Sequence, residues 1–412
     1  METAIPILSE IGSQASERIH CAEDAETLAR LRLPKLIHDF ISAGAGAELA
    51  TAENSRAFGI IKLQARVLRD VSTRSLETKF LAKSYNYPFG FAPMGMCNLA
   101  HPEADAILAR LARQINVPVC LSTAASTSME DMIAIAGENT WFQLYAAGDP
   151  NVAFDLVRRA DTAGFKTLIF TVDVPEVNRR LRDIKNGFEV PFQIGLRQAW
   201  DFARHPRWSL TTLRHGVPKM ANFQKSADSP GFDRTQSRAA ADWEFLSRLR
   251  DLWPGQLVVK GVTSADDAHR VKSAGVDGIY VSNHGGRQLD SSAAAIAILP
   301  AIRAAVGPDY PLCFDSGIRS GEDIVKAIAC GADFVMLGRP LLFALAAEGE
   351  RGLASLLDIF AKDISLTLAQ IGVCDVSEVG RGNLFEPQKS IIEKTWQSLT
   401  VVGQHPQSFM EA

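Results

Sequence analysis

One stretch of the chain, VSNHGGRQLD at residues 281–290, brings a base and a permanent cation close together. It follows an apolar run typical of a strand and precedes an Ala-rich helical run beginning near Ser291. His284 is a candidate base because imidazole titrates near neutrality, and the planar guanidinium of Arg287 suits a carboxylate. The two glycines between them let a flat ring or a substrate approach the backbone. A lone histidine would more simply be a loop hydrogen-bonding residue, but this combination favours proton abstraction beside an anion.

The elements around this stretch predict the fold. From Pro88 onward, short apolar runs alternate with amphipathic helical stretches, which is the pattern of βα units. Eight such runs predict a (β/α)8 TIM barrel rather than an open doubly wound sheet. No GxGxxG follows the first run, which argues against a nicotinamide-binding Rossmann unit. The predicted strands are residues 89–92, 117–121, 141–144, 167–172, 256–259, 278–281, 312–314 and 334–337.

Barrel enzymes carry their chemistry at the C-terminal ends of the strands. The residues at these eight ends are nearly all polar or glycine, and together on one rim they indicate a functional site. Any single one of them could be only a cap or a turn residue. In chain order they are Pro93 with Gly95, Ser122, Gln143 with Tyr145, Thr171 with Asp173, Lys260, Ser282 with His284, Asp315, and Gly338 with Arg339.

The loops after the seventh and eighth predicted strands, Asp315–Gly321 and Gly338–Pro340, predict a phosphate site. Backbone N–H groups at glycines and at a helix N-terminus supply donors in such loops. Arg319 and Arg339 can add charge-assisted hydrogen bonds. Two ordinary βα turns with surface arginines are the alternative, but both loops together favour a phosphate.

SNHGGRQLD resembles the signature of the FMN-dependent L-2-hydroxy-acid dehydrogenases and oxidases, a family that includes glycolate oxidase, L-lactate dehydrogenase and mandelate dehydrogenase. The resemblance extends from about Lys35 to Gly380, with several motifs in the same order. It implies FMN as the cofactor and oxidation of an L-2-hydroxy acid to the 2-oxo acid. The residues leave open whether a C2 carbanion forms first or a hydride is transferred.

The resemblance implies that the phosphate belongs to FMN. By position, Gly317, Arg319, Gly338 and Arg339 would hold the phosphate, and Asp315 would lie on the ribityl chain. Lys260 would stabilise the anionic reduced flavin through its positive charge. The other residues expected at the flavin are Pro93, Gly95, Ser122, Gln143, Thr171 and Ser282.

The resemblance also implies roles around the substrate. Asp173 would orient His284 and stabilise the imidazolium that forms after proton abstraction. Arg180 and Arg287 would bind the substrate carboxylate, and the Tyr145 hydroxyl would point at the 2-oxygen. From the residues alone, Asp173 could equally be a helix cap, and Arg180 could equally be a solvated arginine in a basic run.

The N-terminal part departs from the family at Phe40. The residue after the corresponding aspartate is usually a tyrosine whose hydroxyl meets the substrate carboxylate. Phe40 has no hydroxyl, so this contact is absent here. The departure bears on carboxylate binding and on the substrate class.

An interval of about 188–241 between the fourth and fifth predicted strands is too long for an ordinary βα loop. Its part from about 191 to 225 interleaves aromatic residues with basic ones, which suits the interface of an anionic membrane. A lid on the barrel or an oligomer contact is the alternative. This part resembles the insert of membrane-associated mandelate dehydrogenases, which favours electron transfer to a quinone or similar acceptor over reaction with oxygen. The polar stretch that follows, Ser226 to Ala241, is expected to be mobile.

The whole chain has 412 residues, 47% hydrophobic content and a net charge of -4, which is an ordinary globular composition. Nucleic-acid-binding proteins usually carry a surplus of basic residues, and the net negative charge here argues against nucleic acid as the main partner. The six cysteines are scattered without a CxxC pair or a Cys/His cluster, which predicts free thiols in a reducing compartment and no metal. No secretory signal or bilayer-spanning run is visible, so we expect a cytoplasmic protein with peripheral contact at the inner face of the membrane.

The expected organisation is a helical lead-in at residues 1–87, an FMN-binding barrel at 88–380 with its insert at about 188–241, and a tail at 381–412. The family resemblance implies a homo-oligomer, specifically a tetramer. Two alternative functions stay open: an oxygen-using 2-hydroxy-acid oxidase, and an FMN barrel enzyme that acts on a non-acid substrate.

Overall fold

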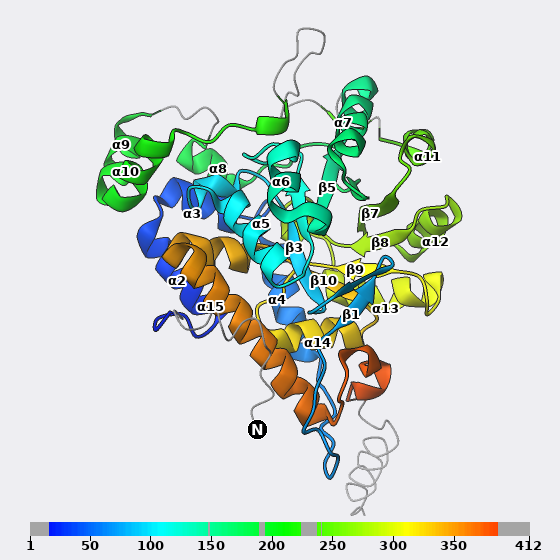
Figure 1. Ribbon diagram of the computed structural model, residues 1–412. Helices are drawn as coiled ribbons and strands as arrows, with labels where there is room; N and C mark the ends of the chain where they lie inside the picture. Colours follow the sequence, from blue (N-terminus) through cyan, green and yellow to red (C-terminus); the bar gives the residue numbers. More distant parts are fainter. Residues whose placement is uncertain (1–15, 147–148, 189–193, 224–236, 240, 386–412) are drawn as a thin grey trace, which may run out of the picture.

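The computed structural model describes residues 16–146, 149–188, 194–223, 237–239 and 241–385. Eight parallel strands in this part close into a barrel, with β10 paired to β3 and the others paired in sequence order (Figure 1). The predicted (β/α)8 architecture is confirmed, and each predicted strand overlaps one of these strands. Their bounds are β3 (Phe89–Met94), β4 (Val119–Ser122), β5 (Thr140–Tyr145), β6 (Thr167–Thr171), β7 (Gln256–Val262), β8 (Gly278–Val281), β9 (Leu312–Phe314) and β10 (Phe334–Leu337).

The strands form from continuous apolar runs because parallel strands in a barrel are buried on both faces. A short antiparallel hairpin of β1 (Thr78–Phe80) and β2 (Lys83–Tyr85) packs against the interior residues. Its Phe80 stacks on Phe334 at 5.2 Å between ring centroids. No sequence pattern predicted this hairpin, which fills the interior away from the C-terminal rim.

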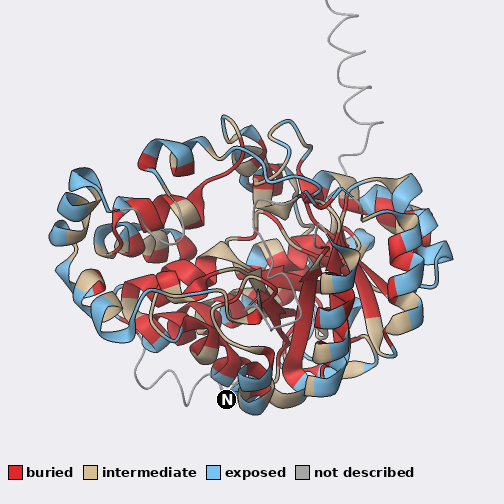
Figure 2. Cartoon of the chain, turned by 90° about the horizontal axis from the view of Figure 1, so that it is seen from above, coloured by how far each residue is buried: buried red, intermediate tan, exposed pale blue. Residues whose placement is uncertain are grey.

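Amphipathic helices surround the strands, with buried faces turned inward and exposed faces outward (Figure 2). Several begin at residues whose side chains accept a hydrogen bond from the first turn, including Ser128, Asp149, Asp242 and Ser320. The last helix contains non-helical backbone at Glu348 and Gly349. The helices are α5 (Ala104–Gln114), α6 (Met129–Ala136), α7 (Pro150–Ala163), α11 (Trp243–Leu252), α12 (Ala265–Ser273), α13 (Ala295–Val306), α14 (Gly321–Ala329) and α15 (Arg339–Ile371).

Three N-terminal helices cover one side of the barrel: α2 (Ala22–Arg32), α3 (Lys35–Ser42) and α4 (Leu49–Ile60). Pro34 separates α2 from α3, and no sequence pattern predicted α4. Short 3-10 turns complete the connections at η2 (Cys97–Leu99), η3 (Gly137–Asn139), η5 (His284–Gly286), η6 (Val376–Glu378) and η7 (Arg381–Asn383).

The excursion between β6 and β7 carries α8 (Leu181–Asn186), α9 (Leu196–Arg204), α10 (Pro206–His215) and η4 (Ala221–Phe223). In Figure 1, α9 and α10 lie beside α3, at the edge of the molecule. Trp208 anchors α10 because its buried indole N–H donates to the Leu99 carbonyl at 2.8 Å. Within the described ranges, no helix has the length and apolar content to cross a bilayer. The insert residues 189–193, 224–236 and 240 lie outside the described part of the chain.

All six cysteines are free thiols, as expected, and Cys97, Cys120, Cys313 and Cys330 are buried.

Candidate active site

The candidate base, His284, follows β8, and its partner, Asp173, follows β6. His284 Nδ1 lies 2.9 Å from Asp173 Oδ1, so Nδ1 carries the proton and Nε2 is left as the basic nitrogen. Burial lowers the pKa of His284 below its ordinary value, Lys260 lowers it further, and Asp173 opposes both. Burial alone would raise the pKa of Asp173, but His284 and Lys260 hold it below its ordinary value. The pair therefore combines a neutral imidazole with a carboxylate that can stabilise its protonated form.

Backbone geometry fixes this pair. His284 has a positive φ of 56°, which a residue with a side chain rarely adopts, and its N–H donates to Ser282 Oγ at 3.0 Å. On β7, Gly261 has φ +102° and a Cβ added there would lie 2.5 Å from Asp173 Cβ. Only glycine at position 261 leaves room for the carboxylate that orients the base.

Lys260, at the end of β7, is 3% exposed and donates to Ser282 Oγ at 2.8 Å. Its Nζ lies 3.5 Å from Asp315, which also accepts a hydrogen bond from the Tyr280 hydroxyl at 2.7 Å. Burial would lower the pKa of Lys260, but Asp315 and Asp173 hold it above its ordinary value. This lysine is therefore a fixed positive charge inside the barrel mouth.

The Tyr145 hydroxyl, at the end of β5, lies 3.4 Å from His284 Nε2. The two rings stack with 6.5 Å between centroids and 24° between planes. An oxygen atom of a ligand placed at this point would meet both the phenolic hydroxyl and the basic nitrogen.

Two guanidinium groups flank the Phe40 ring, with Arg180 at 5.9 Å and Arg287 at 5.8 Å from its centroid. Arg180 also pairs with Asp183 at 3.2 Å. Arg287 donates to the backbone carbonyls of Phe40, Ile41 and Ala43 at 2.7 to 3.1 Å. Burial, with Arg180 and Arg339 nearby, lowers the pKa of Arg287 well below its ordinary value. Such desolvated, mutually repelling cations favour an anionic ligand.

Arg319 and Arg339 follow β9 and β10 and also line the cavity. Arg319 donates to the Ile318 carbonyl at 2.8 Å, and Arg339 donates to the Gly285 carbonyl at 2.8 Å. Burial lowers the pKa of Arg339 to about 9, and Arg319 adds to this effect. Within 4 Å of Gly338, a Cβ would meet no atom, so this turn leaves open space beside the backbone.

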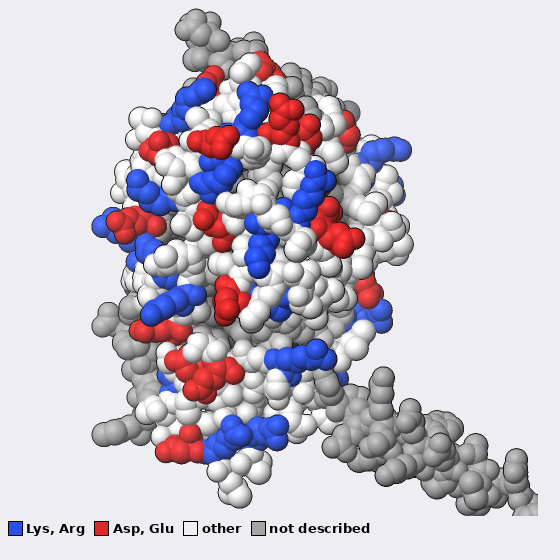
Figure 3. Space-filling model, turned by 90° about the vertical axis from the view of Figure 1, so that its right-hand side faces the viewer, with Lys and Arg blue, Asp and Glu red and all other residues white. Residues whose placement is uncertain are grey.

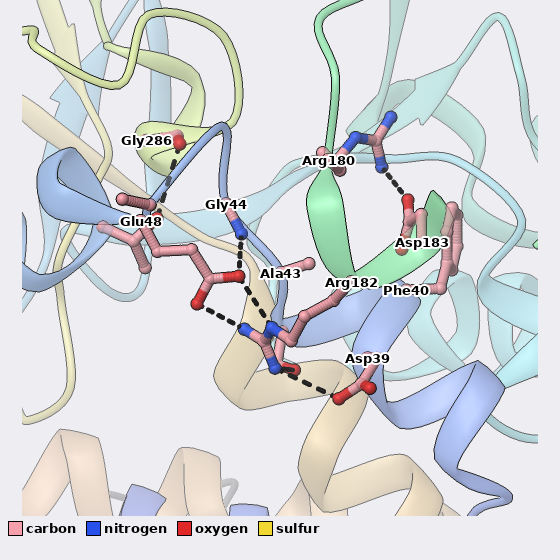
Figure 4. A network of polar contacts seen from close by, with 12 residues as sticks. Asp39, Phe40, Ala43, Gly44, Glu48, Arg180, Arg182, Asp183 and Gly286 are labelled. Atoms are coloured by element: carbon pink, nitrogen blue, oxygen red, sulfur yellow. Dashed lines mark hydrogen bonds and ion pairs between the residues drawn. The ribbon is translucent and has the colours of Figure 1, made fainter. Parts of the chain in front are cut away.

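The loop between α3 and α4 is held against the site from two sides (Figure 4). Arg182 donates to both carboxylate oxygens of Glu48 at 2.6 and 2.8 Å, and Glu48 accepts from the Gly44 N–H at 3.2 Å. On the other side, Asp290 accepts from the N–H groups of Ala47 and Leu49, each at 2.7 Å. The end of α3 and Ala43, whose carbonyls hold Arg287, thus lead into a loop that is fixed by the motif's own aspartate and by Arg182 of α8.

All but four of the predicted site residues line one cavity at the C-terminal rim. Gln143, Thr171, Asp173 and Ser282 lie behind this lining, where Asp173 supports His284 and Ser282 supports Lys260. The predicted lining residues are Pro93, Gly95, Ser122, Tyr145, Arg180, Lys260, His284, Arg287, Asp315, Gly317, Arg319, Gly338 and Arg339.

Sequence reasoning missed several residues of the cavity wall, which include Val174, Val177, Met220 and Arg238. Arg238 falls in the stretch expected to be mobile, and it is instead buried. Arg238 follows a long polar interval, and no sequence pattern there shows that the chain returns to the mouth of the barrel. Its place in the cavity wall could therefore not be predicted.

The residues present fit FMN. In the described part of the chain, the buried Gln143 Nε2 and Thr171 Oγ1 have no hydrogen-bond partner, although buried polar atoms normally have one. Gln143 lies in β5 and Thr171 ends β6, opposite Lys260 in β7, and a flavin ring edge would offer both side chains carbonyl and N–H groups. Arg319, Arg339 and the open turn at Gly338 supply a cationic cradle for the phosphate.

Comparison with known proteins identifies the family. The sequence model of the FMN-dependent dehydrogenases matches residues 29–386. The (S)-mandelate dehydrogenase of Pseudomonas putida is 40% identical over 369 residues, which cover 88% of this chain and 93% of that relative. An L-lactate dehydrogenase of Pseudomonas entomophila is 35% identical over 374 residues, with coverage of 89% and 98%.

A solved structure described as a monotopic membrane protein (S)-mandelate dehydrogenase superposes with a TM-score of 0.85 at 38% identity. The match covers 90% of this chain and 100% of that one. The resemblance seen in the motifs, and its nearness to mandelate dehydrogenase, are thus confirmed. The chain belongs to the FMN-dependent dehydrogenase family and is an oxidoreductase with FMN as its cofactor.

Proposed function

We propose that this enzyme oxidises an L-2-hydroxy acid to the 2-oxo acid, with His284 as the base. The observation that carries the proposal is the His284–Asp173 pair at 2.9 Å, on the same cavity as the guanidinium groups of Arg180 and Arg287 and the cradle for FMN. The names of the two bacterial relatives, mandelate and lactate dehydrogenase, support this substrate class.

His284 Nε2 takes one proton from the substrate, and Asp173 stabilises the resulting imidazolium. The Tyr145 hydroxyl donates to the substrate's 2-oxygen, which lies next to the same nitrogen. FMN, when bound, supplies the chemistry of accepting the two electrons that leave C2. Lys260 places a fixed positive charge where the flavin gains negative charge.

Arg180 and Arg287 bind the substrate carboxylate. Phe40 replaces the family tyrosine and contributes no hydroxyl, so these two guanidinium groups supply the charged contacts. Phe40 stacks on Phe188 with 4.3 Å between centroids and 9° between planes. With Val174, Val177 and Met220 it forms an apolar wall, which favours a substrate with a bulky or aromatic side chain.

The insert attaches the enzyme to the membrane, and a quinone or similar acceptor there receives the electrons. Trp200 and Leu213 are 67% and 79% exposed, although large apolar side chains are normally buried. Arg197, Arg204 and Arg214 lie on the same two helices, α9 and α10. Apolar residues with basic neighbours suit an anionic membrane surface at the cytoplasmic face. The similarity to a monotopic membrane protein supports this placement.

The family resemblance also supports a homotetramer and the division into lead-in, barrel with insert, and tail. Both stay predictions. Size-exclusion chromatography with light scattering measures the first, and limited proteolysis of the holoenzyme maps the second.

The function is tested by anaerobic mixing of the yellow holoenzyme with a panel that includes (S)-mandelate and L-lactate. Bleaching of the flavin absorbance by at least one L-2-hydroxy acid is expected, with no bleaching by the D form. Absence of bleaching by every 2-hydroxy acid would favour the non-acid alternative. Hydrogen peroxide formed in air, without any added quinone and at the rate of turnover, would favour the oxygen-using oxidase.

A further inference from the structure

Arg238 is a buried cation at the candidate active site. It is 7% exposed and lines the cavity. Its N–H donates to the Pro175 carbonyl at 2.8 Å, and its own carbonyl accepts from the Ala241 N–H at 3.1 Å. The contact with Pro175 ties the residue to the segment that follows β6, two residues beyond Asp173.

The cavity wall in the described part of the chain contains six cationic residues. Five have a place in the proposed function: Lys260 at the flavin, Arg319 and Arg339 at the phosphate, and Arg180 and Arg287 at the substrate carboxylate. Arg238 is the sixth. Its guanidinium carbon lies 4.7 Å from the centroid of the Tyr145 ring.

A cation over an aromatic face is attracted by the electron density of the ring. For a phenol, the same field stabilises negative charge on the hydroxyl oxygen, so the O–H becomes a stronger hydrogen-bond donor. Burial raises the pKa of Tyr145, while Lys260 and Arg238 oppose this rise. The hydroxyl affected in this way is the one that lies 3.4 Å from His284 Nε2.

We propose that Arg238 is a positioning residue that acts through Tyr145: it holds the ring beside His284 and strengthens the phenolic hydroxyl as a donor to the substrate's 2-oxygen. The proposal rests on the proposed function, in which this hydroxyl meets that oxygen. When His284 takes the hydroxyl proton, negative charge grows on the 2-oxygen, so a stronger donor stabilises the transition state more than the ground state.

The first test is a double-mutant cycle on the holoenzyme. Arg238→Met and Arg238→Lys are made in the native chain and in Tyr145→Phe, and the anaerobic rate of flavin reduction by (S)-mandelate and by L-lactate is measured. A contribution of about 1 to 2 kcal/mol from a buried cation–π contact corresponds to a loss of about tenfold for Arg238→Met. Arg238→Lys keeps the cation and should stay within about threefold. In the Tyr145→Phe chain, Arg238→Met should change the rate by less than about twofold.

Arg248→Met is the matched control. Arg248 lies over the Phe154 ring at the same distance, 4.7 Å, on α11 and outside the cavity lining. Its loss should leave flavin reduction unchanged. Equal losses from Arg238→Met in both backgrounds would overturn the proposal, as would no loss at all or an Arg238→Lys variant as slow as Arg238→Met.

The second test does not depend on any substrate. The five tyrosines are labelled at Cζ with carbon-13, and the Tyr145 signal is assigned by its loss in Tyr145→Phe. Removing the cation should make the Tyr145 phenol ionise at higher pH in Arg238→Met than in the native protein or in Arg248→Met. An unmoved titration contradicts the action through Tyr145 even if a 2-hydroxy acid bleaches the flavin. A moved titration without bleaching supports it and counts against the proposed substrate class alone.

Discussion

The barrel rim and the α9–α10 insert differ in what they expose: the rim encloses polar groups, and the insert presents apolar side chains to solvent. At the rim, Lys260 is buried, His284 and Asp173 are largely enclosed, and short polar contacts between strand ends fix all three. On the insert, Trp200 and Leu213 extend into solvent from two short helices. The face formed by the helices at the right of Figure 1 differs from both, because acidic and basic side chains are intermixed over it (Figure 3).

The difference shows that catalysis and membrane attachment depend on separate parts of the chain. The reacting groups come from different strands, so the closed sheet fixes their distances from one another. The insert is one excursion between β6 and β7, and contacts such as those of Trp208 with the Leu99 carbonyl and of Asn222 with the Met129 N–H tie it to the barrel. Changes at the rim should therefore alter rate, and changes on the exposed insert residues should alter attachment without altering rate.

The strongest test of the rim is removal of the base. His284→Gln should reduce the anaerobic rate of flavin reduction by about 10³-fold or more, because general-base catalysis contributes about 10² to 10⁴ and the buried pair is lost as well. Bound FMN, measured by absorbance, should remain. His269→Gln on the exposed face of α12 is the control and should react at the native rate. Undiminished bleaching by His284→Gln would remove His284 from its assigned role.

The second-largest loss of rate is expected where Gly261 leaves space for the Asp173 carboxylate. Gly261→Ala places a methyl group where Asp173 lies and should slow flavin reduction by about 10²-fold, since the base loses its orientation. Gly275→Ala is a matched control, because Gly275 also has a positive φ, of +73°, but a Cβ there meets no atom within 4 Å. Both variants should lose about 1 kcal/mol of stability from backbone strain, measured by urea unfolding. Only Gly261→Ala should lose rate, and equal rates in the two variants would argue against the clash.

The pH dependence follows from the buried imidazole. A base works only when neutral, so kcat/KM should fall as the pH drops through the pKa of His284. Because burial and Lys260 lower the pKa of His284, this acid limb should lie below the ordinary histidine value. Asp173→Asn removes the charge that opposes the shift, so its acid limb should move to still lower pH while the plateau rate falls. A limb that moves to higher pH would contradict the assigned pair.

The smallest effect on rate is expected at the insert. The double variant Trp200→Ser with Leu213→Ser should bind vesicles containing anionic lipid at least about tenfold more weakly, because two exposed apolar anchors are lost. Its kcat with a water-soluble electron acceptor should equal that of the native enzyme. Leu366→Ser is the control: this residue is 61% exposed on α15, away from the insert, and should leave vesicle binding intact. A lower kcat in the double variant would show that catalysis and membrane attachment are not separate functions of the rim and the insert.

The strands could be predicted because buried parallel strands leave apolar runs that any reading of the sequence detects. Helix α4 was missed because residues 49–60, LATAENSRAFGI, show almost no apolar periodicity. The helix depends instead on tertiary contacts, such as the hydrogen bonds that the Asp290 carboxylate accepts from the N–H groups of Leu49, its first residue, and of Ala47 just before it.

The site residues could be predicted where they follow strands, since the rim of a barrel gathers them. The contacts of Arg287 with the carbonyls of Phe40, Ile41 and Ala43 could not, because more than 240 residues separate the partners. Arg238 could not either, because no local pattern marks the point where an insert returns to the cavity. Phe40 was singled out, but its position between two guanidinium groups needed the fold.

The cap of α4 by Asp290 sets an order of events during synthesis. A ribosome releases α3 and α4 early, long before residue 290 emerges, so the nascent helices begin without the carboxylate that completes their connecting loop. The Ala43 carbonyl likewise has no Arg287 to accept from until residue 287 has been synthesised. A polypeptide that ends just before residue 287 would contain roughly seventy per cent of the chain but neither Arg287 nor Asp290, and therefore no completed anion pocket.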